Sequence, residues 1–258
     1  MRVYSAALET GDYVFDNMPD DYIKYGFVSF YYIKDNAQFE MIMSKCQHVL
    51  IDSGAFSFQR GQKGNLDDYL RSYARFAKRY TNHPKVEGFF ELDIDSVVGY
   101  EKTLDMRRKL EMVSNKIIPV WHPNRGIKNF YEMCEEYRGK RVAITGFGGD
   151  EIYDDQFNGF INVAHKAGCH IHILGMTRYG LLTSLNLHRE DSADSTSWKQ
   201  SGIFGGILMF DKDFKLQKMK FVEGLEVSYK SLITFNLLMA VKMQHILDNV
   251  DQSVFFHQ

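Results

Sequence analysis

Short apolar runs of the β-strand type alternate along this chain with segments of helical periodicity. Eight such runs occur, at residues 2–8, 48–53, 88–94, 116–121, 141–147, 170–176, 191–198 and 205–210. Strands that alternate with amphipathic helices form parallel sheets, and eight of them in 258 residues predict a closed (β/α)8 barrel, or TIM barrel, of the α/β class. An open doubly wound sheet is the alternative. It is disfavoured because no G-x-G-x-x-G follows the first run.

Apolar residues at helical spacing predict the helices between these runs. The expected helices cover 66–80, 100–113, 127–137, 157–167 and, near the C-terminus, about 225–249. Asn65 is placed to cap the first of them, and Gly139 and Gly168 are placed to end two others. The segment 27–33 fits either a strand or a helix. No linker divides the chain, so we expect one domain over residues 1–258.

Composition limits the class of protein. The cysteines Cys46, Cys134 and Cys169 lack C-x-x-C spacing, which argues against a disulfide framework or a thiolate metal site and suits a reducing compartment. No apolar leader and no 18-residue uncharged stretch is present, so we expect a cytoplasmic protein that does not enter a membrane. The net charge of −2 gives no basic surplus for a polyanion. The lysines within 212–220 form either a local phosphate-binding cluster or an ordinary solvated surface.

Polar residues follow several of the predicted strands. In a (β/α)8 barrel the catalytic groups lie at the carboxyl ends of the strands, where the loops meet at one mouth. The residues at these ends are Asp52 and Ser53, Asp93 and Asp95, Trp121 and His122, Thr145 with Gly146, Gly148 and Gly149, and Asp194 with Ser195 and Thr196. The sequence therefore predicts an active site at this mouth.

Asp52 has both a structural and a functional interpretation. An aspartate at such a junction is often only a helix cap. Here Gly54 and the following loop delay the next helix to about residue 66, which favours a carboxylate that faces the mouth. Gly54 and Ala55 are small enough to let a ligand approach the backbone.

Two further stretches carry carboxylates. In "DSADSTSW" (191–198) the strand is unusually rich in hydroxyl groups, which need partners such as a polar ligand or a fixed carboxylate. In "ELDID" (91–95) strand periodicity puts all three acidic residues on one face, and we expect only Asp93 to reach the pocket.

Two carboxylates across a dry pocket can perform glycosyl transfer, one as nucleophile and one as acid/base, and retaining chemistry needs them about 5–5.5 Å apart.

These motifs resemble those of the tRNA-guanine transglycosylase superfamily (queuine and archaeosine tRNA-ribosyltransferases), particularly its compact phage-type and DNA-modifying branch. "DSGAFS" (52–57) resembles the family's D-S-G-G-F-Q, and "ELDID" resembles its aspartate-bearing third-strand motif. "GFGG" (146–149) resembles its base-binding loop, and "DSADSTSW" resembles the V-D-S-T-S-W of the short branch. The resemblance covers about residues 49–198.

The resemblance implies a pentosyltransferase that exchanges guanine in a nucleic acid for a 7-deazaguanine, such as preQ0 or preQ1, through a covalent glycosyl-aspartate. Asp194 would be the nucleophile, Asp52 the general acid/base and Asp93 the reader of the purine edge. The expected substrate-binding residues are Asp93, Ser53, Gly54, Phe56, His122, Gly148, Gly149 and Ser195. "VWHP" departs from the family's V-Q-G-G, so the role of His122 is open.

The family's C-x-C-x-x-C…H zinc site has no counterpart after Cys169. The missing subdomain and the phage-like motif favour DNA over tRNA as the substrate, and a phage-encoded protein would act in the host cytoplasm. We expect no cofactor and no metal, and a homodimer is compatible with the sequence.

Two other functions compete with base exchange. A metal-dependent barrel hydrolase could use His170 and His172, which share one strand face, with Asp194 as a further ligand. We expect this pair instead to be structural and distant from the mouth. A non-catalytic barrel that binds nucleotides or nucleic acid is the second alternative, although the presence of both Asp52 and Asp194 favours turnover.

Overall fold

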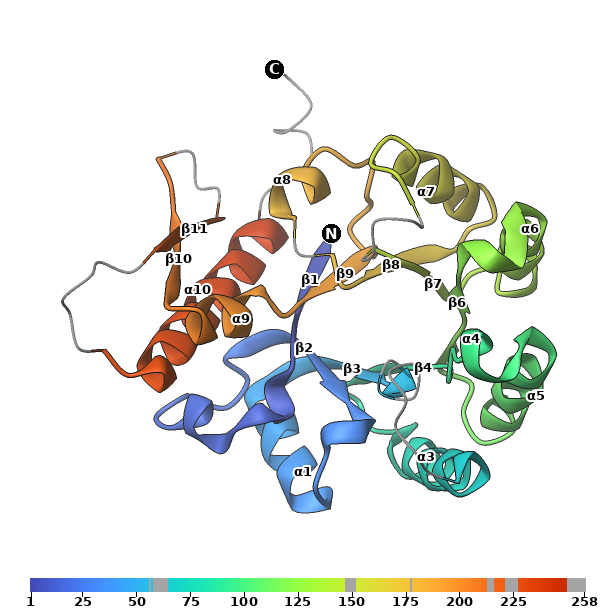
Figure 1. The fold of residues 1–258 in the computed structure, drawn as a ribbon, viewed down its shortest axis with the longest axis horizontal. Coiled ribbons are helices and arrows are strands. Elements are labelled where there is room, and N and C mark those ends of the chain that lie inside the picture. Colours follow the sequence, from blue (N-terminus) through green and yellow to red (C-terminus); the bar gives the residue numbers. More distant parts are fainter. Residues whose placement is uncertain are drawn as a thin grey trace.

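The computed structural model describes residues 1–55, 57, 65–146, 152–176, 178–212, 216–220 and 227–249. It is a barrel of parallel strands surrounded by helices (Figure 1). The strands are β1 (Arg2–Ala6), β2 (Ile23–Ser29), β3 (Cys46–Asp52), β4 (Val86–Phe90), β5 (Ile117–Ile118), β6 (Val120–Trp121), β7 (Arg141–Thr145), β8 (His170–Leu174) and β9 (Ser192–Ser195).

The barrel closes through one interrupted strand. The sheet order is β5-β4-β3-β2-β1-β9-β8-β7-β6, and only Pro119 separates β5 from β6. The two ends of the sheet are therefore halves of the same strand, and all neighbouring pairs in the sheet are parallel. The predicted eight-stranded (β/α)8 barrel is confirmed.

One member of the predicted strand set was wrong. The run 205–210 forms β10 (Gly206–Phe210), which pairs antiparallel with β11 (Leu216–Lys220) in a hairpin outside the barrel. Its place is taken by β2, which includes the start of the unassigned segment 27–33. Gly26 obscures the strand pattern of β2, but the site needs glycine because a Cβ there would lie 2.6 Å from Cys46 Sγ.

The helices follow the predicted pattern closely. They are α1 (Asn36–Lys45), α3 (Leu66–Tyr80), α4 (Asp95–Val98), α5 (Tyr100–Glu111), α6 (Gly126–Glu136), α7 (Phe157–Lys166), α8 (Tyr179–Leu182), α9 (Ser197–Ile203) and α10 (Tyr229–Asn249), with 3-10 turns η1 (Leu8–Thr10), η2 (Asp12–Phe15), η3 (Phe30–Tyr32) and η4 (Pro123–Arg125). Asn65 caps α3 as expected, and Gly139 and Gly168 have positive φ. None of the helices within the described ranges combines the length and apolarity needed to cross a bilayer.

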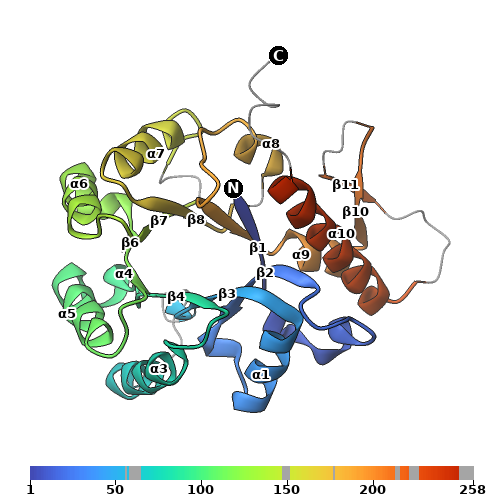
Figure 2. The ribbon, with the colours of Figure 1, turned by 180° about the vertical axis from the view of Figure 1, so that it is seen from behind.

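The C-terminal helix α10 covers the outside of β1 and β2, with the β10–β11 hairpin beyond it (Figures 1 and 2). Gln244 of this helix is buried and its amide joins the two strands. Its oxygen accepts the N–H groups of Lys24 and Tyr25, and its nitrogen donates to Ser5 Oγ at 3.0 Å and to the Tyr25 carbonyl at 2.7 Å. A side chain of α10 thus completes the hydrogen bonding where β2 begins.

The barrel interior is packed with side chains. Its apolar members are Tyr4, Ala6, Tyr25, Phe27, Leu50, Phe90, Ile118, Val120 and Ala143. His172 lies among them, stacked on Phe27 with 5.7 Å between ring centroids and edge-on to Phe90 at 5.0 Å. The interior is therefore a packed core that extends from one end of the barrel to the other.

A charged cluster closes the end of the barrel where the strands begin. Glu87 of β4 accepts hydrogen bonds from Arg2 at 2.9 Å, from Arg141 at 3.2 Å and from the Tyr4 hydroxyl. Burial alone would raise the pKa of Glu87, but the hydrogen bond from His48 and these neighbours hold it well below its usual range. One carboxylate therefore links β4 to β1, β3 and β7.

We predict that Glu87→Gln lowers the free energy of unfolding by about 2 kcal/mol at pH 7, because it leaves two arginines without their shared charge. A depressed carboxyl pKa stabilises the fold above the unfolded value of 4.5, and this contribution is lost as pH falls through the folded value. Urea denaturation at pH 7 measures the difference, and most of it should persist at pH 4, because the folded carboxyl group is still ionised there. The exposed Glu101→Gln is the control, and equal losses in both variants would contradict the assignment.

Candidate functional site

Acidic side chains from four strands gather at the carboxyl-end mouth of the barrel. Asp52 ends β3, Asp93 follows β4, and Asp194 lies near the end of β9. Glu9 follows β1, in the turn η1. Because the strands are parallel, all four belong to the same end of the barrel.

The predicted catalytic residue Asp52 has a raised pKa. Burial raises its pKa to about 7, and the negative charges of Asp93 and Asp194 act in the same direction. Hydrogen bonding by Ser29 and by the Gly54 N–H, 2.9 Å from Oδ2, opposes the shift. Near neutral pH this carboxyl group can therefore both give and take a proton.

The backbone after Asp52 differs from the expectation. Ala55 and Ser57 are already helical, so helical structure begins before residue 66. Gly54 has a φ of +82°, and a Cβ there would lie 2.4 Å from Tyr31 Cβ and 2.8 Å from the Tyr69 hydroxyl oxygen. Glycine is thus required by the left-handed backbone and by tyrosine packing, and the idea that it leaves room for a ligand was wrong.

The other predicted residues of this motif are placed in part. Ser53 is fully buried, its Oγ accepts the Ala55 N–H at 3.4 Å, and its carbonyl accepts the Tyr69 hydroxyl at 2.6 Å. Phe56 lies outside the described residues. In the glycine-rich loop, Thr145 is buried and Gly146 donates to the Leu174 carbonyl at 2.7 Å, whereas Gly148 and Gly149 lie outside the described ranges.

Asp194 is held by two donors, one from the neighbouring strand β8 and one from the residue that follows this strand. The Gly175 N–H lies 2.7 Å from Oδ1, and His172 Nε2 lies 3.3 Å from the same oxygen. The Asp194 side chain is only 8% exposed. It is therefore fixed in position and keeps Oδ2 outside both of these contacts.

His172 has a role that the sequence interpretation missed. It was expected to be structural and far from the mouth, but it contacts Asp194 directly. Its Nδ1 lies 2.8 Å from Ser192 Oγ, so both ring nitrogens are engaged within the protein. Burial lowers the pKa of His172, and a neutral ring satisfies both contacts when Ser192 donates to Nδ1 and Nε2–H donates to Asp194.

The hydroxyl groups of "DSADSTSW" find partners inside the protein. Ser192 bonds to His172, and Ser195 Oγ donates to Ser197 Oγ at 2.9 Å and accepts the Ser197 N–H. A bound ligand is not needed to explain them. The fixed carboxylate that was the other expectation is present, because the Ser192–His172 pair supports Asp194.

Asp93 is paired with His122. The distance between Asp93 Oδ2 and His122 Nε2 is 2.8 Å. Burial acts to lower the pKa of His122, but the hydrogen bond and the charge of Asp93 outweigh it and raise the pKa above 6.5. The two side chains therefore offer an acceptor and a donor side by side.

The two other acids of "ELDID" point elsewhere. β4 ends at Phe90, so strand periodicity does not extend through residues 91–95 as expected. Arg125 contacts both acids, with Nη1 3.2 Å from Glu91 Oε1 and Nη2 2.6 Å from Asp95 Oδ1. Glu91 also accepts the Val120 N–H at 2.7 Å. These contacts brace the two loops that carry Asp93, after β4, and His122, after β6.

Glu9 and Lys199 are site residues that the sequence interpretation did not include. Burial raises the pKa of Glu9 to about 7, Asp52 adds to the shift, and Lys199 opposes it. Burial lowers the pKa of Lys199. The rule that strand ends carry the chemistry could have found Glu9, because it directly follows the first apolar run.

Ligand-type side chains for a metal also meet away from the mouth. Within the described part of the chain, a group of three is formed by His165, His188 and Asp191. It lies beside the start of β9, at the opposite end of the barrel from Asp194.

No family model and no curated protein matches the chain. Among solved structures it is similar to one described as a novel GH10 endoxylanase retrieved from sugarcane soil metagenome. The two chains are 12% identical, the match covers 68% of each, and the TM-score is 0.40. A similarity of this degree says nothing about the reaction.

We predict that Asp52→Asn stabilises the protein at pH 8 by about 2 kcal/mol. A carboxyl group with a folded pKa near 7 and an ordinary value of 3.8 contributes its full stability below 3.8 and loses it as pH rises through 7. The asparagine avoids the cost of a buried charge. Chemical denaturation at pH 8 and pH 4 should show a gain that vanishes at the lower pH, while the exposed Asp16→Asn shows none. Equal stability of wild type and variant at pH 8 would mean that Asp52 is well solvated.

Proposed function

We propose that the protein is a transglycosylase that exchanges a guanine base of a nucleic acid for a 7-deazaguanine such as preQ0 or preQ1. The observation that carries the proposal is the raised pKa of the buried Asp52 carboxyl group at the mouth of the barrel. Its carboxyl group has a pKa near 7 and interacts electrostatically with Asp194, which comes from a different strand. A proton-exchanging carboxyl group and a second, anchored carboxylate are the pair that retaining glycosyl transfer requires.

In the first step Asp194 attacks the sugar. Its free oxygen forms a bond to C1′ while the bond from C1′ to guanine N9 breaks and its electron pair leaves with the base. Asp52, in its protonated form, donates a proton to the departing guanine. Gly175 and His172 hold the nucleophile through Oδ1, which leaves Oδ2 to react.

The second step reverses the roles. The incoming 7-deazaguanine gives its N9 proton to Asp52, and N9 forms the bond to C1′ as the Asp194 ester breaks. The carboxylate is released and Asp52 is protonated again for the next cycle. No oxidant and no cofactor enters this balance.

Asp93 and His122 would recognise the base. The N1–H and N2–H groups of guanine are adjacent donors, and they match a carboxylate acceptor. The 2.8 Å contact with His122 fixes the direction of the Asp93 carboxylate. The same edge is present in 7-deazaguanines, so one reader serves both the leaving and the entering base.

The nucleic acid would need its phosphate contacts outside the acidic mouth. The β10–β11 hairpin carries exposed lysines at 218 and 220, and Lys212 is exposed nearby in the chain. Such contacts give affinity without sequence selection. The motif resemblance and the absence of the family's cysteine-rich zinc motif favour DNA as the polymer.

The direct test is exchange of labelled guanine or preQ0 into DNA and into tRNA. We predict that Asp194→Asn abolishes exchange and forms no covalent adduct with the polymer, because the amide cannot act as the nucleophile. Asp52→Asn should slow exchange by at least about 100-fold through loss of the general acid/base. The exposed Asp12→Asn is the control and should retain wild-type rates. Wild-type exchange by Asp194→Asn, or no exchange by the wild type with either polymer, would refute the proposal.

We predict that His172→Phe lowers kcat by about 10-fold or more and leaves KM nearly unchanged. Phenylalanine can fill the aromatic site beside Phe27 and Phe90, but it removes one of the donors that hold Asp194. Steady-state exchange kinetics separate the two parameters, and the melting temperature reports any loss of packing. A rise in KM at unchanged kcat would show that the histidine does not position the nucleophile.

A further inference from the structure

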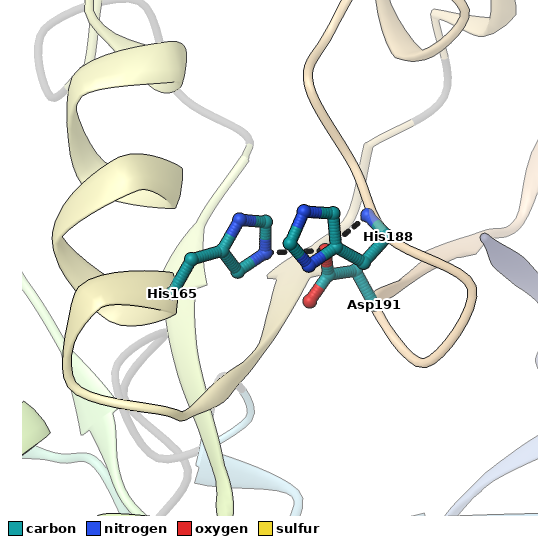
Figure 3. Close-up of side chains that lie close together, drawn as sticks. All are labelled: His165, His188 and Asp191. Atoms are coloured by element: carbon teal, nitrogen blue, oxygen red, sulfur yellow. Dashed lines mark hydrogen bonds and ion pairs between the residues drawn. The ribbon is translucent and has the colours of Figure 1, made fainter.

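Two histidines and an aspartate meet at the end of the barrel where the strands begin. His165 lies on α7, and His188 and Asp191 lie in the segment that leads into β9 (Figure 3). One ligand-type atom of each side chain lies within 4.8 Å of those of the others. The cluster is separate from the candidate active site, because the strands run from this end toward the mouth.

Asp191 is fixed before any ligand binds. It is fully buried. Its Oδ1 accepts the Ile171 N–H at 2.8 Å, and its Oδ2 accepts the His188 backbone N–H at 2.6 Å and faces His165 Nε2 at 2.7 Å. The carboxylate therefore needs little ordering to act as a ligand.

The two imidazole rings are also close together. They stack in parallel, with 3.6 Å between centroids and 10° between planes. Imidazole nitrogens are common ligands of metal ions in proteins. His188 is exposed, so its ring can turn toward the carboxylate at little cost, whereas His165 is only 13% exposed.

We propose that His165, His188 and Asp191 bind a zinc ion. Two imidazole nitrogens and one carboxylate oxygen form a donor set that zinc accepts, with the fourth position open to water beside the exposed ring. The ion would take the place of the direct contact between His165 Nε2 and Asp191 Oδ2. It links α7 to the segment before β9, three residues ahead of Asp194, and so it stabilises the frame of the barrel without entering the reaction.

The test is zinc binding by the purified full chain. Equilibrium dialysis against micromolar zinc with elemental analysis should give one zinc per chain, and zinc should raise the melting temperature by about 5 °C or more at 100 times Kd, reversibly with EDTA. His188→Ala should weaken binding by more than about 10-fold and at least halve the thermal shift at the same zinc concentration. This variant keeps the backbone N–H that holds Asp191, so its zinc-free melting temperature should match that of the wild type.

His165→Ala is the second ligand variant and should weaken binding likewise. The matched control is His170→Ala, which removes a half-buried histidine at the start of β8 and should leave binding unchanged. Absence of stoichiometric binding in the wild type overturns the proposal. So does wild-type affinity in both ligand variants, or a loss of binding in the control as large as theirs.

Discussion

Parallel pairing around a closed barrel decides where every polar strand end must lie. The sheet closes because β5 and β6 are halves of one strand, with β4 hydrogen bonded to the first half and β7 to the second. Once closed, the barrel gathers carboxylates that are far apart in the sequence into one partly buried mouth. Removal from water and mutual repulsion then disfavour their charged forms, and this is why Asp52 and Glu9 both have pKa values near 7.

The packed interior extends this constraint to Asp194, the proposed nucleophile. His172 lies among the aromatic rings of the barrel, and it uses one ring nitrogen on Ser192 and the other on Asp194. The carboxylate is thus positioned by the core as well as by its own strand. Pre-positioning of this kind favours reaction because little ordering remains to be done when substrate binds.

The sequence predicted the barrel and most of its helices because amphipathic periodicity reflects burial directly. It failed where a local signal and its tertiary context differ. The run 205–210 has strand character, but it pairs in a hairpin outside the barrel. β2 was obscured by Gly26, whose small size is set by contact with Cys46, a neighbour that no local pattern reveals.

The candidate site shows the same division. The strand-end rule placed Asp52, Asp93 and Asp194 at the mouth, and applied to the first strand it would have added Glu9. It could not show that Gly54 packs against Tyr31. Nor could it show that Arg125 binds Glu91 and Asp95, whereas Asp93 pairs with His122. Those outcomes depend on partners from other segments of the chain.

Asp191 and Asp194, at the two ends of β9, have different surroundings. Side chains alternate along a strand, so Ser192 and Asp194 face the barrel interior with His172, while Ala193 packs outward against the helical layer. Asp191 lies on the outward side, where N–H donors from three residues surround it. Asp194 has donors on one oxygen and the mouth beside it. The same residue type three positions apart therefore has donors on both oxygens in one case and on one oxygen in the other, and the difference comes from the pleat of β9 and the closure of the barrel around it.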